Sequence, residues 1–368
     1  MSFVDHFSHI EDPRKPINLK YDFLDMLFLT VAGVVSGAEG WSDIVDFGHN
    51  KLDWLQQYRD FEHGIPVDDT LARIIRAIDP TQLNQAFIDW VNEERRETGK
   101  EQIAIDGKTL RGSREAEQHS ALHSITAWSK SEGLVLAQLK SSAKKNENAS
   151  VLEVLNVLNV KGATVTVDAM NTQRKIAERI IDKKGDYVMC VKGNQKTLRE
   201  EIAAYFHKVE RDTPEHLKID EEVDKGHGRV EVRRCSALRV SEWISEADKW
   251  KGIQSIVKVE RERHLLSTGK VQTETQYYIS SLAASPKELA EAIRGHWEVE
   301  NKVHWVLDVT FGEDESRIRM GDSPQNMAVV RAITLNLLKR DSSKSSLRQK
   351  RLCVAMDNDF LFRLLNLF

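Results

Sequence analysis

Cysteine is scarce in this sequence, and its placement excludes two classes of small protein. The 368 residues include three cysteines, Cys190, Cys235 and Cys353, and no two of them form a CxxC pair. A zinc ribbon needs clustered thiolates, and a disulfide framework needs an even, closely spaced set. Sparse cysteines are typical of proteins that fold in a reducing cytoplasm.

Long hydrophobic runs are also missing. The longest apolar stretch covers residues 23–38, and Asp25, Thr30 and Ser36 interrupt it. A membrane-spanning helix needs roughly 20 consecutive apolar residues, so this stretch predicts a buried helix. The N-terminal residues include early acids such as Asp5 and lack the basic-then-apolar order of a signal peptide. We therefore expect no membrane partner and a cytoplasmic location.

The chain has no excess of positive charge. Its 53 lysines and arginines against 57 acids give a net charge of −4, which argues against a general nucleic-acid coat protein. Local charge is what decides DNA binding, and residues 339–351 carry six basic residues against Asp341 alone. Such a chain can hold metal ions with carboxylates in one place and grip phosphates in another.

The spacing of apolar residues divides the chain into four parts. Helical spacing predicts helices near both ends, including one over 289–307 and one that starts with Asp79 as N-cap and Pro80 at its first position. Alternating and continuous apolar runs between them predict strands. The expected parts are a small helical N-terminal domain at 1–98, the first part of a catalytic core at 99–205, a β-rich insertion at 206–284, and the last part of the core with C-terminal helices at 285–368.

The order of elements within residues 99–205 predicts the fold of the core. Three strands are followed by a helix, a strand, a helix, a strand and a helix. Three adjacent strands favour an antiparallel meander, and the later alternation favours parallel strands added at its edge. This is the element order of a ribonuclease H-like fold. We therefore expect an α/β protein with a ribonuclease H-like catalytic core.

Two aspartates follow strands that lie side by side in such a sheet. Asp106 ends the first strand of the core and Asp168 ends the fourth. Because both strands run the same way, both carboxylates should emerge at one edge of the sheet, where the active sites of open α/β sheets lie. Two close carboxylates repel unless a cation neutralises them. Mg²⁺ (or Mn²⁺) suits such a pair, because it keeps positions for water and phosphate oxygens.

A third carboxylate is expected from the helix after the insertion. Glu298 and Glu300 point about 200° apart on a helix, so only one of them can face the metal site. Trp297 lies on the same side as Glu300, and we therefore choose Glu300, with Asp314 and Glu315 as reserve candidates. Three acids that hold two metal ions about 3.5–4 Å apart suit the in-line cleavage of a phosphodiester bond.

Polar and aromatic residues near these acids suit contacts with DNA. Lys108 and Arg111 closely follow the first acid and are candidates for binding phosphates. Asn194 and Gln195 follow a predicted strand end and are candidates for hydrogen bonds to the sugar–phosphate backbone or a base edge. Trp297 is a candidate for stacking on an unpaired base.

Five strings of the sequence closely resemble the H-repeat-associated proteins of bacterial Rhs elements and the insertion-sequence transposases related to them. In chain order they are AIDGKTLRGS, TVDAMNTQ, DYVMCVKGNQ, KGHGRVEVR and IRGHWEVENKVHWVLDVTFGED. The resemblance covers essentially the whole chain. It implies a DDE-type DNA transposase with a ribonuclease H-like core, whose catalytic and metal-binding acids are Asp106, Asp168 and Glu300.

The resemblance also implies partners. They are the terminal repeats of the protein's own mobile element and the target DNA, which would bring the protein to the bacterial nucleoid. The helical region at 1–98 would recognise the element ends, and a homodimer or higher multimer would pair two of them. The implied reaction is metal-dependent hydrolysis of a phosphodiester bond, followed by transfer of the freed 3′-OH to target DNA.

One departure affects the third acid. Many related transposases carry a Tyr-x2-Arg-x3-Glu-x6-Lys pattern, but with Glu300 as the acid the matching positions are Ile293, His296 and Leu307. Arg294 is then the candidate for the phosphate contact of the missing arginine. Two other functions stay open on the same core. One is a catalytically silent DNA-binding relic of a transposase, and the other is a structure-specific nuclease that cuts DNA without strand transfer.

Overall fold

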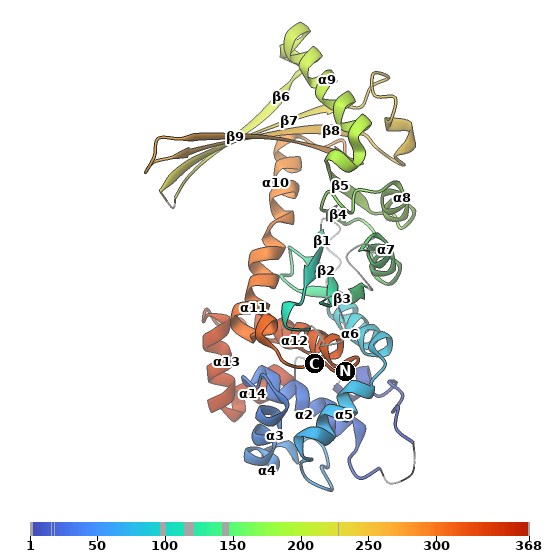
Figure 1. The fold of residues 1–368 in the computed structure, drawn as a ribbon, viewed down its shortest axis with the longest axis vertical. Helices are drawn as coiled ribbons and strands as arrows, with labels where there is room; N and C mark the ends of the chain where they lie inside the picture. Colours follow the sequence, from blue (N-terminus) through green and yellow to red (C-terminus); the bar gives the residue numbers. More distant parts are fainter. Residues whose placement is uncertain are drawn as a thin grey trace.

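The computed structural model describes residues 3–15, 17, 19–95, 101–113, 121–141, 147–226 and 228–366. The molecule is elongated (Figure 1). Helices from both ends of the chain form one end, a mixed sheet lies in the middle, and the sheet continues into a curved extension at the other end.

Six helices form the described N-terminal part, as the apolar spacing predicts. They are α1 (Phe3–Phe7), α2 (Phe23–Val35), α3 (Trp41–Asn50), α4 (Leu52–Leu55), α5 (Asp68–Ala77) and α6 (Pro80–Glu94). Helix α6 begins as predicted, because Asp79 accepts a hydrogen bond from the Thr81 amide and Pro80 occupies the first helical position. Helix α2 is buried along nearly its whole length. None of the helices in the described part of the chain has the length and apolar character needed to cross a bilayer.

The central sheet confirms the predicted ribonuclease H-like core. Its strands are β1 (Gln102–Thr109), β2 (His123–Ser129), β3 (Val135–Ser141), β4 (Thr164–Val167) and β5 (Asp186–Val191). They lie in the order β3-β2-β1-β4-β5, with β1, β2 and β3 antiparallel and β1, β4 and β5 parallel. Helices α7 (Glu147–Val157) and α8 (Arg174–Asp182) cover one face and α10 (Pro286–His296) covers the other (Figure 1).

The β-rich insertion extends this same sheet. It contains β6 (Lys218–Gly226), β7 (Arg229–Arg239), β8 (Ser255–Leu265) and β9 (Val271–Ser280). Strand β9 pairs antiparallel with β5, so the nine strands form one sheet in the order β3-β2-β1-β4-β5-β9-β8-β7-β6. Helix α9 (Lys196–Asp212) precedes β6, and it runs across the boundary expected at residue 205. The insertion therefore continues the core sheet.

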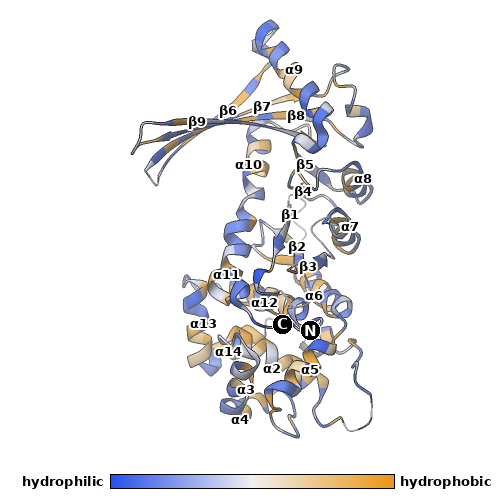
Figure 2. Cartoon of the chain, in the orientation of Figure 1, coloured by the Kyte–Doolittle hydropathy of each residue, from blue (hydrophilic) through white to orange (hydrophobic). Residues whose placement is uncertain are grey.

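Helix α12 joins the two ends of the chain in one hydrophobic core. The C-terminal helices are α11 (Trp305–Phe311), α12 (Ser323–Arg340), α13 (Leu347–Met356) and α14 (Asn358–Leu365). Helix α12 is almost wholly buried and packs against α2, α5, α6 and β3. Figure 2 shows hydrophobic residues gathered where these helices meet. The division into four domains stays a prediction, since the N-terminal and C-terminal helices share this core.

Candidate active site

The parallel pairing of β1 with β4 places the first two predicted acids. The last paired residues of the two strands are Ile105 and Val167. Asp106 and Asp168 each follow directly, so their backbones leave this pair side by side. This is the arrangement that the sequence predicts for the two aspartates, and it follows from strand direction and register alone.

The helical segment after the insertion runs along β1 and brings up the third acid. At the start of β1, Gln102 Nε2 donates to the Ala292 carbonyl at 2.6 Å. Further along, His304 Nδ1 lies 3.6 Å from Asp106 Oδ2. Helix and strand approach closely at Gly295, where an added Cβ would stand 2.3 Å from Gln102 Oε1. Glu300 lies between these contacts in the chain and lines the same pocket as the two aspartates.

The predicted helix over 289–307 is interrupted by a π-helical turn. Helix α10 ends at His296, residues Glu300–His304 form the π turn, and α11 begins at Trp305. The turn is closed by the Trp305 amide, which donates to the Glu300 carbonyl. Single π turns are frequent at functional sites because they change which side chains share a face.

The three acids line one pocket of about 190 Å³. Asp106, Asp168 and Glu300 lie on its wall together with Trp297 and His296. Glu298 does not line this pocket, since its carboxylate pairs with Lys130 at 3.3 Å. The choice of Glu300 over Glu298 therefore agrees with their placement.

Crowding of carboxylates changes the acidity of Asp106. The pKa of this carboxyl is raised from 3.8 to about 7, mainly by burial and also by the charges of Asp168 and Glu300, while a hydrogen bond from the Gly107 amide opposes the rise. Such a group ionises readily when a cation is nearby. Oxygen donors with space for water between them match the coordination that Mg²⁺ prefers. Within the described residues, however, no three His, Cys, Asp or Glu side chains stand together as a group that could already hold a metal ion.

Two buried histidines flank Glu300 and were not among the predicted site residues. His296 Nδ1 lies 3.1 Å from Thr166 Oγ1, and burial lowers its pKa to about 4. Burial also lowers the pKa of His304 to about 3. Both rings are therefore neutral near pH 7. The signal for them was present in the sequence, because residues 296, 300 and 304 are spaced four apart and share one helical face.

Asp168 also has a buried hydrogen-bond partner, Asn171, that the sequence did not predict. Its Oδ1 accepts hydrogen bonds from the backbone amide and from Nδ2 of Asn171, at 3.0 and 2.8 Å. The same Nδ2 donates to Glu147 Oε1 at 2.5 Å. Glu147 lies 21 residues before Asp168 in the chain, so only the packing of α7 against the sheet reveals the contact.

Lys108 and Arg111 are not brought to the pocket. The ammonium of Lys108 is buried and pairs with Asp308 and Glu313. Arg111 is 82% exposed and lies near Asp314, 3.7 Å from its carboxylate. Acids from α11 and from the segment after it therefore engage basic residues at the end of β1 and just beyond it.

Asn194 and Gln195 hold the loop behind Asp168. Asn194 Nδ2 donates to the Ala169 carbonyl at 2.7 Å, and Gln195 Nε2 donates to the Thr172 carbonyl at 3.1 Å. Their amide groups are thus used to fix the turn that follows β4. Trp297 does line the pocket, and 40% of its surface is exposed.

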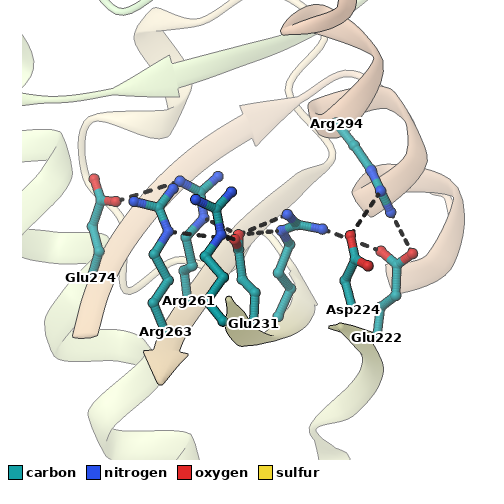
Figure 3. A network of polar contacts seen from close by, with 9 residues as sticks. Glu222, Asp224, Glu231, Arg261, Arg263, Glu274 and Arg294 are labelled. Carbon is teal, nitrogen blue, oxygen red and sulfur yellow. Dashed lines mark hydrogen bonds and ion pairs between the residues drawn. The ribbon is translucent and has the colours of Figure 1, made fainter. Parts of the chain in front are cut away.

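A larger cleft of about 730 Å³ adjoins the acid pocket, between α10 and the insertion sheet. The two share Tyr278, Ile293 and Trp297 in their walls. On the sheet side, several arginines converge on the buried carboxylate of Glu231 (Figure 3). Arg294 of α10 pairs with Glu222 and Asp224 of β6, so it also lies at this cleft (Figure 3).

Comparison with known proteins agrees with the motifs. Residues 97–337 match the family model described as "Transposase DDE domain", and residues 4–91 match the one described as "DDE_Tnp_1-associated". The chain is 40% identical to "H repeat-associated putative transposase YhhI" of Escherichia coli K12, over 97% of this chain and 96% of that protein. It is 39% identical to "Putative transposase YncI" of E. coli O157:H7, over 98% and 93%.

Two further matches either cover a smaller part of the chain or have a low structural similarity. "Inactive transposase YbfQ" of E. coli K12 is 50% identical over 20% of this chain and 86% of that protein. Among solved structures, the piggyBac transposase synaptic complex with hairpin DNA matches at a TM-score of 0.43 and 10% identity, over 98% of this chain and 76% of that one. That TM-score is too low to support a conclusion. Residues 97–337 match the family model, and relatives align over nearly their whole length. The chain therefore belongs to the DDE transposase family.

Proposed function

We propose that this protein is a DNA transposase whose Asp106, Asp168 and Glu300 hold divalent metal ions, Mg²⁺ or Mn²⁺, for phosphodiester cleavage and strand transfer. The observation that carries the proposal is the convergence of three carboxylates, from β1, β4 and the helical segment after the insertion, on one pocket. Family membership supports it. When bound, a metal pair supplies activation of the attacking oxygen and stabilisation of the leaving oxygen.

The residues around the acids have separate tasks in this proposal. Asp106 takes its ionised form when metal is present, because a nearby cation offsets the cost of burying its charge. His296 and His304 remain neutral near pH 7, so they add no positive charge that would compete with the metal for the carboxylates. Trp297, at the opening between pocket and cleft, offers a surface on which a base can stack.

In this proposal the DNA partner lies in the cleft beside α10. A strand whose scissile phosphate sits at the acids would leave through the shared opening and pass Arg233 and Arg261 on the sheet and Arg294 on α10. These arginines are partly paired with acids, so they exchange one carboxylate partner for a phosphate. Recognition of element ends by the helices at 1–98, and pairing of two ends by a homodimer or higher multimer, complete the proposed function.

A catalytically silent DNA-binding protein is the second candidate. One relative bears the name of an inactive transposase, so loss of activity is a real alternative for a member of this family. The presence of all three acids around one pocket favours an active enzyme, because decay would not preserve a costly cluster of like charges.

Cleavage of DNA that carries the element's end tests the proposal. The wild type should cut in Mg²⁺ or Mn²⁺, and Asp106→Ala, Asp168→Ala and Glu300→Ala should each lose cutting. Glu298→Ala is the matched control and should keep cutting, because Glu298 lines the neighbouring cleft but not the acid pocket. Binding of the end without cutting by the wild type would instead favour the silent protein.

A further inference from the structure

A line of polar side chains, buried except for Thr109 at its outer end, leads to Asp168 from the face of the sheet covered by α7. It begins at Thr109 at the end of β1 and passes through His123 of β2 and Glu147, the first residue of α7, to Asn171 in the turn after β4. The donor–acceptor distances along it are 3.1 Å (Thr109 Oγ1 to His123 Nδ1), 2.8 Å (His123 Nε2 to Glu147 Oε2), 2.5 Å (Glu147 Oε1 to Asn171 Nδ2) and 2.8 Å (Asn171 Nδ2 to Asp168 Oδ1).

The three side chains between Thr109 and Asp168 are withdrawn from water. Asn171 is 0% exposed, Glu147 2% and His123 4%. Burying such groups costs free energy unless their hydrogen bonds are satisfied, and here both oxygens of Glu147 have partners. The line also lies directly against the backbone next to Asp106, since a Cβ added to Gly107 would stand 2.6 Å from His123 Nε2 and 2.8 Å from Glu147 Oε1.

The chemistry of Asn171 determines how it must be oriented. Two carboxylate oxygens converge on its Nδ2, and only the NH₂ end of an amide can donate to both. Its Oδ1 has no hydrogen-bond partner among the described residues. Asp168 Oδ1 accepts two hydrogen bonds from Asn171, one from its Nδ2 and one from its backbone amide. Within the described part of the chain no group donates a hydrogen bond to Asp168 Oδ2, so this oxygen is free to bind a ligand.

We propose that Asn171, held in place by Glu147 and His123, is the positioning residue that orients the Asp168 carboxylate for a divalent metal ion. The inference rests on the proposed function, because it takes Asp168 as a metal ligand. Groups that hydrogen-bond to a metal ligand fix its orientation, and their loss typically costs about 10–100-fold in metal affinity. Glu147 acts on Asp168 through Asn171, and His123 acts through Glu147.

Metal affinity of the full chain tests this role without any cleavage reaction. Binding of Mn²⁺ alone is measured by the loss of the electron paramagnetic resonance signal of free Mn²⁺. Asn171→Ala should weaken binding about 10–100-fold. The matched control is Asn326→Ala, because Asn326 is also 0% exposed and its Nδ2 also donates to two acceptors, here the Ile75 and Ile78 carbonyls. Asn326→Ala should lower stability and leave Mn²⁺ binding unchanged.

A second pair of variants covers the case in which Asn171→Ala does not fold. Glutamine at position 147 can accept from Asn171 and donate to His123, whose ring then takes the other tautomer, whereas alanine loses both contacts. Glu147→Gln should therefore bind Mn²⁺ nearly as well as the wild type, and Glu147→Ala should bind it about 10-fold less tightly. Equal losses in both variants would mean that the charge of Glu147 matters and would overturn the positioning role.

Asp168→Ala separates this inference from the proposed function. If the wild type binds Mn²⁺ and Asp168→Ala does not, Asp168 is a ligand, and undiminished binding by a folded Asn171→Ala variant would then overturn the positioning role alone. If Asp168→Ala binds Mn²⁺ as tightly as the wild type, or the wild type binds none, both the proposed metal site and this inference fall.

Discussion

Lys108 Nζ lies 2.5 Å from Glu313 Oε2, and the two side chains are only 10% and 1% exposed. Asp308 contacts the same ammonium. The pair connects β1, two residues after Asp106, to the segment that follows α11, so it fixes the strand that carries one acid against the helical segment that carries another. Lys108 was predicted to bind DNA phosphates, and its partners in the structure are instead two carboxylates of the protein itself.

Replacing Lys108 should therefore destabilise the fold. Lys108→Met leaves the buried Glu313 carboxylate without its cation, and breaking a buried pair typically costs about 3–5 kcal/mol. Urea unfolding measures the change. Arg111→Met is the control, because Arg111 is 82% exposed, and it should change the unfolding free energy by less than about 0.5 kcal/mol. An unchanged urea midpoint for Lys108→Met would show that the pair contributes nothing to stability.

The stability of the metal-free protein should depend on pH through Asp106. Burial, reinforced by Asp168 and Glu300, raises the pKa of this carboxyl from 3.8 to about 7. Between these values the unfolded chain releases the proton and the folded chain keeps it, so the contribution of Asp106 to the unfolding free energy falls as pH rises. Above about pH 7 the folded carboxyl is also ionised and the loss is complete.

Asp106→Asn removes this titration. The unfolding free energy of the variant, relative to that of the wild type, should increase from about pH 4 to about pH 7, by on the order of 4 kcal/mol at most. Urea unfolding in EDTA at both pH values measures this double difference, in which the other titrating groups largely cancel. A difference that stays constant with pH would contradict the raised pKa.

Gly107 should tolerate no side chain. A Cβ there would stand 2.6 Å from His123 Nε2, and the ring is held on both sides by hydrogen bonds. Gly107→Ala should cost about 1–3 kcal/mol of stability, because the packed neighbours must move. Gly226→Ala, also in a strand but with open space around the new Cβ, is the matched control. Equal urea midpoints for the two variants would show that the site relaxes freely.

Arg261 should contribute to the salt dependence of DNA binding. It lines the cleft beside α10, and its neighbours there include other arginines. If it contacts one phosphate, Arg261→Ala should reduce the slope of log affinity against log salt by about 0.9 on duplex DNA. Fluorescence anisotropy over a salt series measures the slope. Arg211→Ala on α9, which does not line the cleft, should leave it unchanged. Identical slopes for all three proteins would place DNA elsewhere.

Strand direction and local patterns were enough to predict part of the site. Asp106 and Asp168 directly follow apolar runs, and parallel strands put their ends at one edge, so no long-range information was needed to bring them together. Helix periodicity likewise predicted that Glu300, and not Glu298, faces them. Both predictions need only the local pattern of individual strands and helices.

The sequence by itself determined the helical ends, the ribonuclease H-like order of the core and the identity of the acids around the pocket. Only the tertiary structure decided that β9 continues the core sheet beside β5, that Lys108 faces Glu313, and that Glu147 reaches Asp168 through Asn171. Side-chain period and capping are local and can be read from neighbouring residues. The partner of a buried charge is set by which distant segments pack against it, and a separation such as that between residues 108 and 313 leaves no trace in local spacing.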